Sequence, residues 1–578
     1  MTISKPIIKE IQDNENALSE LEKEIYSNKS ESIQKIIGSF PTVYIHNWSK
    51  YNKYEVYVGE TNNIFNRTRE HFYVSAKNKD WHGSLKKRDA SLYIIGHEHF
   101  NKSLTLDIEN RLMHYLMSVD NVRQVHNGRG NPQGNYYPSY EFDAIFSEVW
   151  GELHRRNDKL FPNESAIKDS AIYKASPLHK LTRKQEDAKN RIISCVENAM
   201  NQKEIIFIDG EAGTGKTVLN SSAFYELLCR TEKQDAKDFK CYMIVNHKEQ
   251  VKVYADIFKK LGIEEKYGKV VSKASPFLNQ HKEDDSIDVA FIDEAHLLFT
   301  QGNQGYRGKN QLDDIVKKAK ITVIVFDENQ ILRMDQYWES QMIEKYRNKA
   351  IAQNNHIILT EQLRMHADKD TLHWIDSFTK EQRIEKIPHG DYEIKIFDSP
   401  MELEAAITEK AQKEESKLSR LIASYDWQYK EKQRPQRRAL KYWEVMIKKW
   451  HRPWNYELSS ELTSGQRRAI ANQAWAEQEH TIREVGSTYT IQGFDLNYAG
   501  IILGKSVRYR NGKIEYDPSR SSNDKVHKCR KMNDGTMKNF GEELIKHEVR
   551  VLMTRGVNGM YIYACDDELR DALKKAES

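Results

Sequence analysis

A glycine-rich segment with a lysine and a threonine is the strongest chemical signal in the sequence. Residues 210–217 read GEAGTGKT and follow the apolar run IIFI, which is typical of a β-strand. Glycines let successive backbone N–H groups turn toward phosphate oxygens, a lysine supplies charge to the β- and γ-phosphates, and a threonine hydroxyl can bind Mg²⁺. We therefore predict an ATP and Mg²⁺ site that contains Gly210, Gly213, Thr214, Gly215, Lys216 and Thr217.

A second apolar run ends in two carboxylates. The sequence VAFIDEAH has four apolar residues before Asp293 and Glu294. Hydrolysis of a nucleotide needs one carboxylate for the bound metal and another to position the attacking water. This spacing predicts Asp293 as a ligand of Mg²⁺ and Glu294 as the general base.

Further motifs follow in order over about 400 residues, namely LTRKQEDA, VIVFDENQ, LTEQLRM, GSTYTIQGFD and RVLMTRGVNGMYIYACDDEL. With the phosphate loop, they resemble a superfamily 1 helicase. The segments HRPWN, TIQGFD, AGIILG and the C-terminal stretch more narrowly resemble the Schlafen group 3-like DNA/RNA helicase domain. The resemblance implies adenine recognition by Gln185, coupling of γ-phosphate to the nucleic-acid groove by Asp327 and Gln330, two γ-phosphate arginines at Arg364 and Arg555, and a further motif at Gln492 and Gly493.

The two arginines have a physical purpose. Phosphoryl transfer builds charge on equatorial oxygens, and arginine side chains stabilise that charge. Since Arg364 and Arg555 come from segments well apart in the chain, we expect two domains to close on ATP and complete the site. Outside the ordered series of motifs, either arginine could equally be a surface ion-pair partner.

A second candidate site lies near the N-terminus, where TVYI and YVG contain Tyr44 and Tyr57, and where Arg67 and His71 follow at helical spacing. Cleavage of a phosphodiester requires a metal-binding carboxylate, a base and a cation on the phosphate. These segments resemble the GIY-YIG nuclease signature, although Thr42 and Val43 replace the glycine and isoleucine of its first triplet.

That resemblance implies a role for each matching residue. Glu109 would hold one divalent cation, either Mg²⁺ or Mn²⁺. Tyr44 or Tyr57 would assist deprotonation of water, Arg67 would stabilise the transition state, and His71 would be a secondary base or phosphate ligand. Asn127 is our choice for the terminal asparagine, with Asn131 and Asn135 as competitors.

Structural alternatives apply to several segments. The tyrosine-rich hairpin and the basic helix after it could serve only the fold. His97 and His99 in GHEHF could bind a metal, but a strand end is the preferred interpretation because no second ligand cluster has the usual spacing. In YWEVMIKKWHRPWNY, tryptophans alternate with basic residues, so the segment either stacks bases beside phosphates or closes a small core. The sequence leaves that choice open.

The order of apolar segments predicts the elements that position these sites. Short aromatic and β-branched runs over 39–150 predict a small α+β GIY-YIG-like domain after an N-terminal helical arm, 1–38, with Ile8, Ile11, Leu18, Leu21 and Ile25 at helical spacing. A linker, 151–180, would follow. Strands alternating with helices then predict two RecA-like α/β domains with parallel sheets, 181–390 and 391–578, the second interrupted by a basic aromatic insertion at about 428–480.

Composition limits the class of protein. Of 578 residues, 39% are apolar and 30% charged, which is typical of a folded globular protein rather than a disordered one. The net charge of +4 does not by itself indicate a nucleic-acid binder. The five cysteines form no CxxC pair, so a disulfide framework or zinc ribbon is not expected. The absence of a long apolar run or signal-peptide core predicts no membrane segment and a cytoplasmic location.

Together these patterns predict an ATP-driven helicase or translocase fused to a metal-dependent endonuclease. We expect a nucleic-acid partner, DNA rather than RNA, and a use in defence against phage or foreign DNA. One alternative is a nucleic-acid-stimulated ATPase switch whose N-terminal domain binds nucleic acid or a partner without cutting. Another is an RNA-processing nuclease-helicase. The sequence leaves the oligomeric state open.

Overall fold

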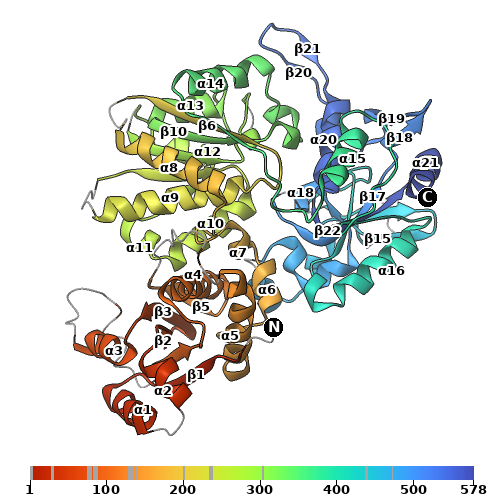
Figure 1. The fold of residues 1–578 in the computed structure, drawn as a ribbon. Helices are drawn as coiled ribbons and strands as arrows, with labels where there is room; N and C mark the ends of the chain where they lie inside the picture. Colours follow the sequence, from red (N-terminus) through yellow and green to blue (C-terminus); the bar gives the residue numbers. More distant parts are fainter. Residues whose placement is uncertain are drawn as a thin grey trace. The chain divides into compact units, whose positions relative to one another are not determined.

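The computed structural model describes the chain except for residues 1–3, 28–30, 74–80, 82–88, 128–135, 137–138, 199–201, 234–237, 285, 303–304, 432, 436–440, 471–472 and 492. It forms two compact units (Figure 1). Unit 1 contains residues 1–182 with 253–270, and unit 2 contains residues 183–252 with 271–578. No helix among the described residues is long and apolar enough to cross a membrane.

Unit 1 is built on a five-stranded sheet in the order β1-β4-β2-β3-β5. All neighbours are antiparallel except β3 and β5. Strands β2 and β3 form the hairpin expected from the sequence, and its two turn residues, Tyr51 and Asn52, have φ values of 54° and 60°. The strands are β1 (Ile7–Gln12), β2 (Thr42–Lys50), β3 (Lys53–Thr61), β4 (Ser91–Gly96) and β5 (Val122–Val125).

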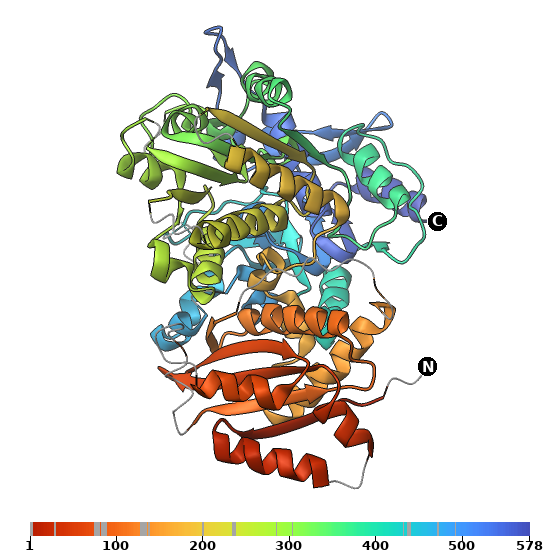
Figure 2. The ribbon, with the colours of Figure 1, turned by 60° about the vertical axis from the view of Figure 1, so that its left-hand side comes forward.

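Helices cover both faces of this sheet. Helix α4 lies across one face, and α1 and α2 lie on the other (Figure 2). The helices are α1 (Glu15–Ser27), α2 (Glu31–Gly38), α3 (Ile64–Tyr73), α4 (Lys102–Ser118), α5 (Phe142–Arg156), α6 (Glu164–Asp169), α7 (Ala171–Ala175) and α11 (Ile263–Tyr267).

The N-terminal segment differs from the predicted helical arm. Residues 7–12 form a strand that pairs with β4, with Ile8 opposite Ile95. The helical interpretation of Ile8 and Ile11 was wrong, because the edge of the sheet supplies backbone partners that the sequence pattern does not reveal. The predicted helix is present only from Glu15, where Leu18, Leu21 and Ile25 are buried.

The predicted linker also differs from the structure. Residues 151–180 contain the end of α5 and the helices α6 and α7. Leu160 and Phe161 are fully buried, and Tyr173 stacks on His114 of α4 at 4.0 Å between ring centroids. Such burial is typical of a folded element rather than of a linker, so the interpretation of this charged segment as a connection was wrong.

Unit 2 contains two parallel sheets. The first has the order β11-β6-β10-β9-β7-β8. Its strands are β6 (Glu204–Gly210), β7 (Cys241–Val245), β8 (Val271–Ser272), β9 (Ile287–Asp293), β10 (Ala319–Phe326) and β11 (His356–Leu359). Helices α8 (Arg183–Asn198) and α9 (Lys216–Lys233) pack side by side on one face, and α13 (Gln311–Lys318) and α14 (Ser340–Ala352) lie on the other (Figure 1). The prediction of buried parallel strands from apolar runs is confirmed in this sheet.

The second sheet has the order β12-β22-β17-β13-β16 and is also parallel. Its strands are β12 (Glu393–Ile396), β13 (Arg420–Ala423), β16 (Gly486–Ser487), β17 (Leu496–Leu503) and β22 (Gly556–Ala564). The helices around it include α15 (Lys369–Thr379), α16 (Pro400–Ala411), α18 (Thr488–Ile491), α20 (Gly541–Met553) and α21 (Asp567–Glu577). The α/β class with two parallel sheets therefore agrees with the sequence prediction.

The aromatic insertion carries the antiparallel hairpin β14 (Glu444–Ile447) and β15 (Trp450–Pro453). Trp454 is fully buried and Trp450 is 6% exposed, and both belong to a core cluster with Leu403 and Val485. Because a buried ring cannot stack a base, the structure favours the core interpretation for these two tryptophans. Tyr456 is more exposed, at 37%.

Candidate nucleotide site and N-terminal tyrosine site

The phosphate loop connects β6 to α9. Strand β6 ends at Gly210 and α9 begins at Lys216, so the helix N-terminus and the loop N–H groups face a common site for an anion. Gly213 and Gly215 have φ values of 88° and 75°. A Cβ atom at Gly213 would lie 1.9 Å from Gln362 Oε1, so the close approach also requires glycine there.

Gln185 and Lys216 both donate hydrogen bonds to backbone carbonyls of this loop. Gln185 on α8 is buried, and its Nε2 donates to the Thr214 carbonyl at 3.3 Å. Lys216 Nζ donates to the Glu211 carbonyl at 2.7 Å and lies 3.1 Å from Asp327 Oδ2. The structure thus brings the predicted adenine-contacting residue and the predicted phosphate lysine to the same loop.

The two predicted carboxylates follow β9. Asp293 is buried, and its Oδ1 accepts from the backbone N–H of Glu294 at 3.1 Å. Glu294 adopts a left-handed backbone conformation with φ of 51°, and its Oε2 lies 3.1 Å from Nε2 of His296. Burial lowers the pKa of His296. The hydroxyl of Thr217 and the carboxylate of Asp293 are the hard oxygen ligands that Mg²⁺ prefers, so this donor set fits the metal.

A chain of polar contacts leads from Lys216 to Arg555. Gln330 Nε2 donates to Asp327 Oδ2 at 2.7 Å, and Arg555 Nη2 donates to Gln330 Oε1 at 3.1 Å. Burial opposes ionisation of Asp327, but the charge of Lys216 and the hydrogen bond from Gln330 lower its pKa to about 2. Burial lowers the pKa of Arg555 to about 10, which leaves the guanidinium charged at neutral pH. The two parallel-sheet halves of unit 2 are therefore linked through these side chains.

The remaining predicted residues of unit 2 are Arg364, Gly493 and Gln492. Arg364 Nε lies 2.7 Å from Asp495 Oδ1. The charge of Arg364 adds to burial in lowering the pKa of Arg555, so the two predicted arginines interact. Gly493 has φ of 84°, and a Cβ there would lie 2.9 Å from Gln250 Nε2, which explains the glycine. Gln492 lies outside the described residues.

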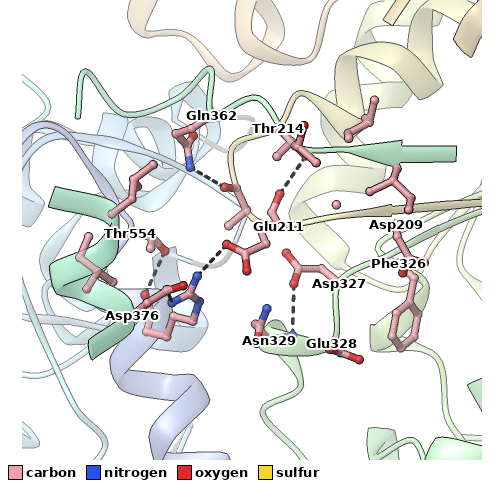
Figure 3. Close-up of a pocket in the computed structure, with 18 of the residues that line it drawn as sticks. Asp209, Glu211, Thr214, Phe326, Asp327, Glu328, Asn329, Gln362, Asp376 and Thr554 are labelled. Carbon is pink, nitrogen blue, oxygen red and sulfur yellow. Dashed lines mark hydrogen bonds and ion pairs between the residues drawn. The ribbon is translucent and has the colours of Figure 1, made fainter. Parts of the chain in front are cut away.

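Sequence reasoning missed Glu211, Asp376 and Arg550. Arg550 Nη2 on α20 lies 2.7 Å from Glu211 Oε2 of the phosphate loop, and its Nη1 binds Asp376 on α15. These residues line a pocket of about 480 Å³ beside the phosphate loop (Figure 3). Glu211 occupies a position that the GxxxxGK[ST] pattern leaves free. Arg550 is the first residue of the C-terminal motif RVLMTRGVNGMYIYACDDEL, but the resemblance assigned a role only to Arg555 within it.

Unit 1 brings Tyr44, Tyr57 and His71 together. Tyr44 Oη lies 3.0 Å from His71 Nε2, and the rings of Tyr57 and His71 are 5.4 Å apart between centroids. A Cβ at Gly59 would lie 2.4 Å from Tyr44 Oη, so the glycine of the YVG segment makes room for the phenol. Burial raises the pKa of Tyr44 well above its ordinary value, while Arg67 opposes that shift.

Glu109 and Asn127 complete this group. Asn127 Nδ2 donates to Glu109 Oε1 and to the Val58 carbonyl, each at 2.9 Å. For Tyr57, burial is the largest cause of a raised pKa, and Arg67 and Glu109 act on it in opposite directions. Glu109 supplies the hard oxygen that a divalent cation prefers, so the donor type fits Mg²⁺ or Mn²⁺. Asn131 and Asn135 lie outside the described residues.

Each histidine of the alternative metal pair has a hydrogen-bonding partner elsewhere in the fold. His97 Nε2 lies 2.9 Å from the Ser4 carbonyl, and His99 Nδ1 lies 2.6 Å from Glu141 Oε2. In the part of the chain that the structure describes, no group of three or more His, Cys, Asp or Glu side chains has the arrangement of a metal site. Strand β4 ends at Gly96, directly before His97, so the interpretation of this segment as a strand end is confirmed.

Residues 203–566 match the family model described as the Schlafen group 3 DNA/RNA helicase domain. The chain is 30% identical over 430 residues to an uncharacterized protein of Saccharomyces cerevisiae, an alignment that covers 68% of this chain and 90% of the yeast protein.

Two helicases are among the solved structures that the chain matches. The DEAD-box helicase Mss116 bound to single-stranded RNA and UDP-BeF matches with 12% identity, coverage of 70% of this chain and 76% of that one, and a TM-score of 0.33. The DUF1998 helicase MrfA bound to DNA matches with 12% identity, coverage of 70% and 52%, and a TM-score of 0.30.

Proposed function

Because the chain belongs to the family of the Schlafen group 3 DNA/RNA helicase domain, we propose that unit 2 hydrolyses ATP to move along or remodel nucleic acid. The single observation that supports this most is the chain of contacts Lys216–Asp327–Gln330–Arg555. It joins the phosphate loop to the second parallel sheet, so a change at the nucleotide can alter the relation between the two sheets.

Each residue has a separate task in this proposal. The loop N–H groups and Lys216 bind the phosphates, and Gln185 orients the base. Glu294 positions the attacking water. Because burial lowers the pKa of the neighbouring His296, that imidazole is uncharged. Arg555 and Arg364 bring positive charge when the sheets close on ATP. Mg²⁺, held by Thr217 and Asp293, would neutralise charge on the β- and γ-phosphates.

Steady-state ATP hydrolysis with and without single-stranded DNA or RNA tests this function. Lys216→Ala and Glu294→Gln should each lower the stimulated rate by about 100-fold or more, as expected for loss of a phosphate contact and of the water-positioning base. Lys203→Ala is the matched lysine control, because Lys203 is exposed and lies directly before β6, at the end of the strand opposite to the phosphate loop. Parental turnover in both site variants would contradict the assignment.

A second function is favoured by the convergence of Tyr44, Tyr57, His71, Glu109 and Asn127 in unit 1. We propose that this group, with Arg67, cuts a phosphodiester in DNA. A tyrosine phenolate would take a proton from water, Arg67 would bind the scissile phosphate, and Asn127 would orient Glu109. A divalent cation bound by Glu109 would supply Lewis acidity at the phosphate. Such a cutter fused to a motor would suit defence against foreign DNA.

Incubation of the full chain with end-labelled DNA and RNA, with Mg²⁺ or Mn²⁺, tests the second function. Glu109→Gln and Arg67→Gln should each reduce cleavage by about 100-fold or more. Glu152→Gln on α5, which pairs with Arg155, is the matched carboxylate control. Nucleic-acid-stimulated ATP hydrolysis without any cleavage would favour the non-cutting switch instead. Cleavage confined to RNA would favour RNA processing.

A further inference from the structure

A basic segment of unit 2, between β17 and α20 in the chain, has no part in the mechanism above. Residues 520–538, which we call the basic arm, contain six Lys and Arg but two Asp and Glu, an excess as large as the net charge of +4 of the whole chain. The arm forms a short helix and a hairpin that projects beyond α20 (Figure 1), namely α19 (Asp524–His527), β20 (Arg530–Lys531) and β21 (Met537–Lys538). An excess of positive charge on one segment is typical of a surface that binds polyanions.

The lysines of the basic arm have no acidic partners. Within the part of the chain that the structure describes, no ion pair is formed by any of the four, namely Lys525, Lys528, Lys531 and Lys538. Lys525 is half-buried and the other three are exposed. The two arginines of the arm do form ion pairs, Arg520 with Asp517 at 3.0 Å and Arg530 with Glu339 at 3.7 Å. The charge of the lysines is therefore available to an anion from outside the chain.

Cations gather around Lys525. Burial is the largest cause that lowers the pKa of Lys525, and the charges of Arg333 and Lys528 lower it further. Asp335 and Asp524 act in the opposite direction, but Asp335 is already bound by Nε and Nη2 of Arg333 at 2.9 and 2.7 Å. Because an anion between these cations would relieve their repulsion, the cluster favours a bound phosphate.

The basic arm follows a strand of the second sheet in the chain, but it is anchored on segments that follow strands of the first sheet. Arg530 is 2% exposed, and its Nη1 donates to Thr300 Oγ1 at 2.6 Å and to the Met334 carbonyl at 3.1 Å. The backbone N–H of Asn533 donates to Glu339 Oε1 at 3.1 Å. Thr300 comes after β9, and Met334 and Glu339 come after β10. A surface that is fixed before its ligand arrives loses less entropy on binding.

The beginning of the basic arm lies at the carboxyl edges of both parallel sheets. Asn523 Nδ2 donates to Oη of Tyr489, which lies on α18 directly after β16. Tyr489 Oη donates to the Leu332 carbonyl at 3.4 Å, in the segment after β10. The next residue, Arg333, is one of the cations that act on Lys525. Ligands of parallel sheets bind outside the carboxyl ends of the strands, and Lys525 lies at such a place for both sheets.

We infer that the basic arm binds the phosphate backbone of a nucleic-acid strand and holds that strand against both parallel sheets. The inference rests on the proposed motor function, for which it assigns a nucleic-acid surface outside the phosphate loop and outside the predicted motifs. Lysine ammonium groups bind phosphates as point charges and release counterions, so this contact carries no base specificity. Since the arm continues from the second sheet and is anchored beside the first, a strand bound to it contacts both halves of the motor.

Salt-dependent binding of a fluorescent oligothymidylate to the full chain, followed by anisotropy, tests the inference. Replacing all four lysines of the arm by Gln should weaken binding about tenfold or more. The slope of log K against log salt concentration should fall by about 0.7 for each lysine that contacts a phosphate. The matched control replaces four exposed lysines on other parts of unit 2 by Gln and should keep the parental slope, namely Lys309, Lys349, Lys386 and Lys413.

Cys529 provides a second measurement in the arm itself. It is the exposed one of the five cysteines and lies between Lys528 and Arg530. With the oligonucleotide at about four times its Kd, alkylation of Cys529 by a maleimide should slow about fivefold, as mass action requires for a covered site. Polyglutamate of equal charge should protect it less. Equal protection by polyglutamate would assign the arm to an acidic protein partner and overturn the inference.

An equal salt slope in the parent and the fourfold variant would also overturn it. If that variant does not fold, Lys528→Gln and Lys531→Gln decide the matter singly, because both positions are exposed. Binding that depends on these lysines, in a parent that does not hydrolyse ATP, would refute the motor and leave the arm as a nucleic-acid surface. ATP hydrolysis stimulated by nucleic acid, with an unchanged slope in the variants, would refute only the inference.

Discussion

At the scale of single residues, buried carboxyl groups differ in pKa and therefore in charge. Asp327 remains ionised because Lys216 lies 3.1 Å away. Glu484 and Glu548 are also buried, but burial raises the pKa of each to about 8. Glu484 accepts hydrogen bonds from the Trp475 indole at 2.7 Å and the Leu458 N–H at 3.0 Å, which are neutral donors. A nearby cation, rather than burial alone, therefore decides whether such a group is charged.

The raised pKa of Glu484 predicts a pH-dependent stability. A carboxyl that ionises more readily when unfolded contributes stability that is complete below its ordinary pKa, near 4.5, and is lost as pH rises toward 8. The free energy of unfolding should fall by about 1.4 kcal/mol per pH unit for this group within that window. Urea unfolding between pH 5 and 8 measures the slope. Glu484→Gln should flatten it, whereas Glu479→Gln, at an exposed position, should not.

A second prediction at the scale of single residues concerns Gln330 and the stimulation of ATP hydrolysis. It binds Asp327 and Arg555 at once, so Gln330→Ala breaks the link between phosphate loop and second sheet. The ratio of nucleic-acid-stimulated to basal ATP hydrolysis should fall about tenfold, the size of a typical coupling between sites. Gln341→Ala on the exposed face of α14 is the matched control. An unchanged ratio would show that stimulation does not pass through Gln330.

At the scale of elements, helix α20 joins the two parallel sheets of unit 2. His547 Nδ1 lies 2.9 Å from the Ile331 carbonyl and must donate to it, since a carbonyl oxygen can only accept. Arg550 pairs with Glu211 in the phosphate loop, and Arg555 follows the end of the helix. One helix thus contacts both the loop that binds phosphate and the segment after β10. Helix α20 therefore connects the phosphate loop with the second sheet inside unit 2.

The Arg550–Glu211 pair predicts a change in nucleotide affinity. The Glu211 carboxylate pairs with two cations, Arg550 and Lys380, the latter at 2.9 Å. Without Arg550 its negative charge is less compensated, so it repels phosphate more strongly. Arg550→Gln should therefore weaken binding of a fluorescent ATP analogue about fivefold, within the usual range for a partly buried charge pair. The double variant with Glu211→Gln should recover most of the loss. Arg570→Gln on α21 is the arginine control, and equal losses in single and double variants would contradict this account.

At the scale of the whole molecule, unit 1 includes a segment that is distant in sequence. Residues 253–270 belong to it by contact, although they lie between β7 and β8 of a sheet in unit 2. Lys260 is buried, and its Nζ donates to the carbonyls of Met117 and Val119 at 3.0 and 2.9 Å. These carbonyls lie at the C-terminal end of α4, where a helix lacks internal donors.

These contacts predict that replacing Lys260 lowers the stability of unit 1. Lys260→Met removes two hydrogen bonds to the end of α4, and unit 1 should lose about 2 to 3 kcal/mol of stability. Hydrogen exchange of peptides from α4 in the full chain measures the loss, because local protection reports local stability. The adjacent Lys259→Met, at an exposed position, should leave α4 as protected as in the parent.

The sequence by itself determined the features that depend on local pattern. The phosphate loop, the strand-end carboxylates and the parallel strands are recognisable because each needs particular residue types at fixed spacing. The partners of Arg555, the charge state of Glu484 and the strand formed by residues 7–12 are not, since each depends on a group far away in the chain. The buried pair of His46 and Asp13 shows the same limit. Only the tertiary structure brings the Asp13 carboxylate to the His46 ring, because long-range packing decides which buried polar groups meet.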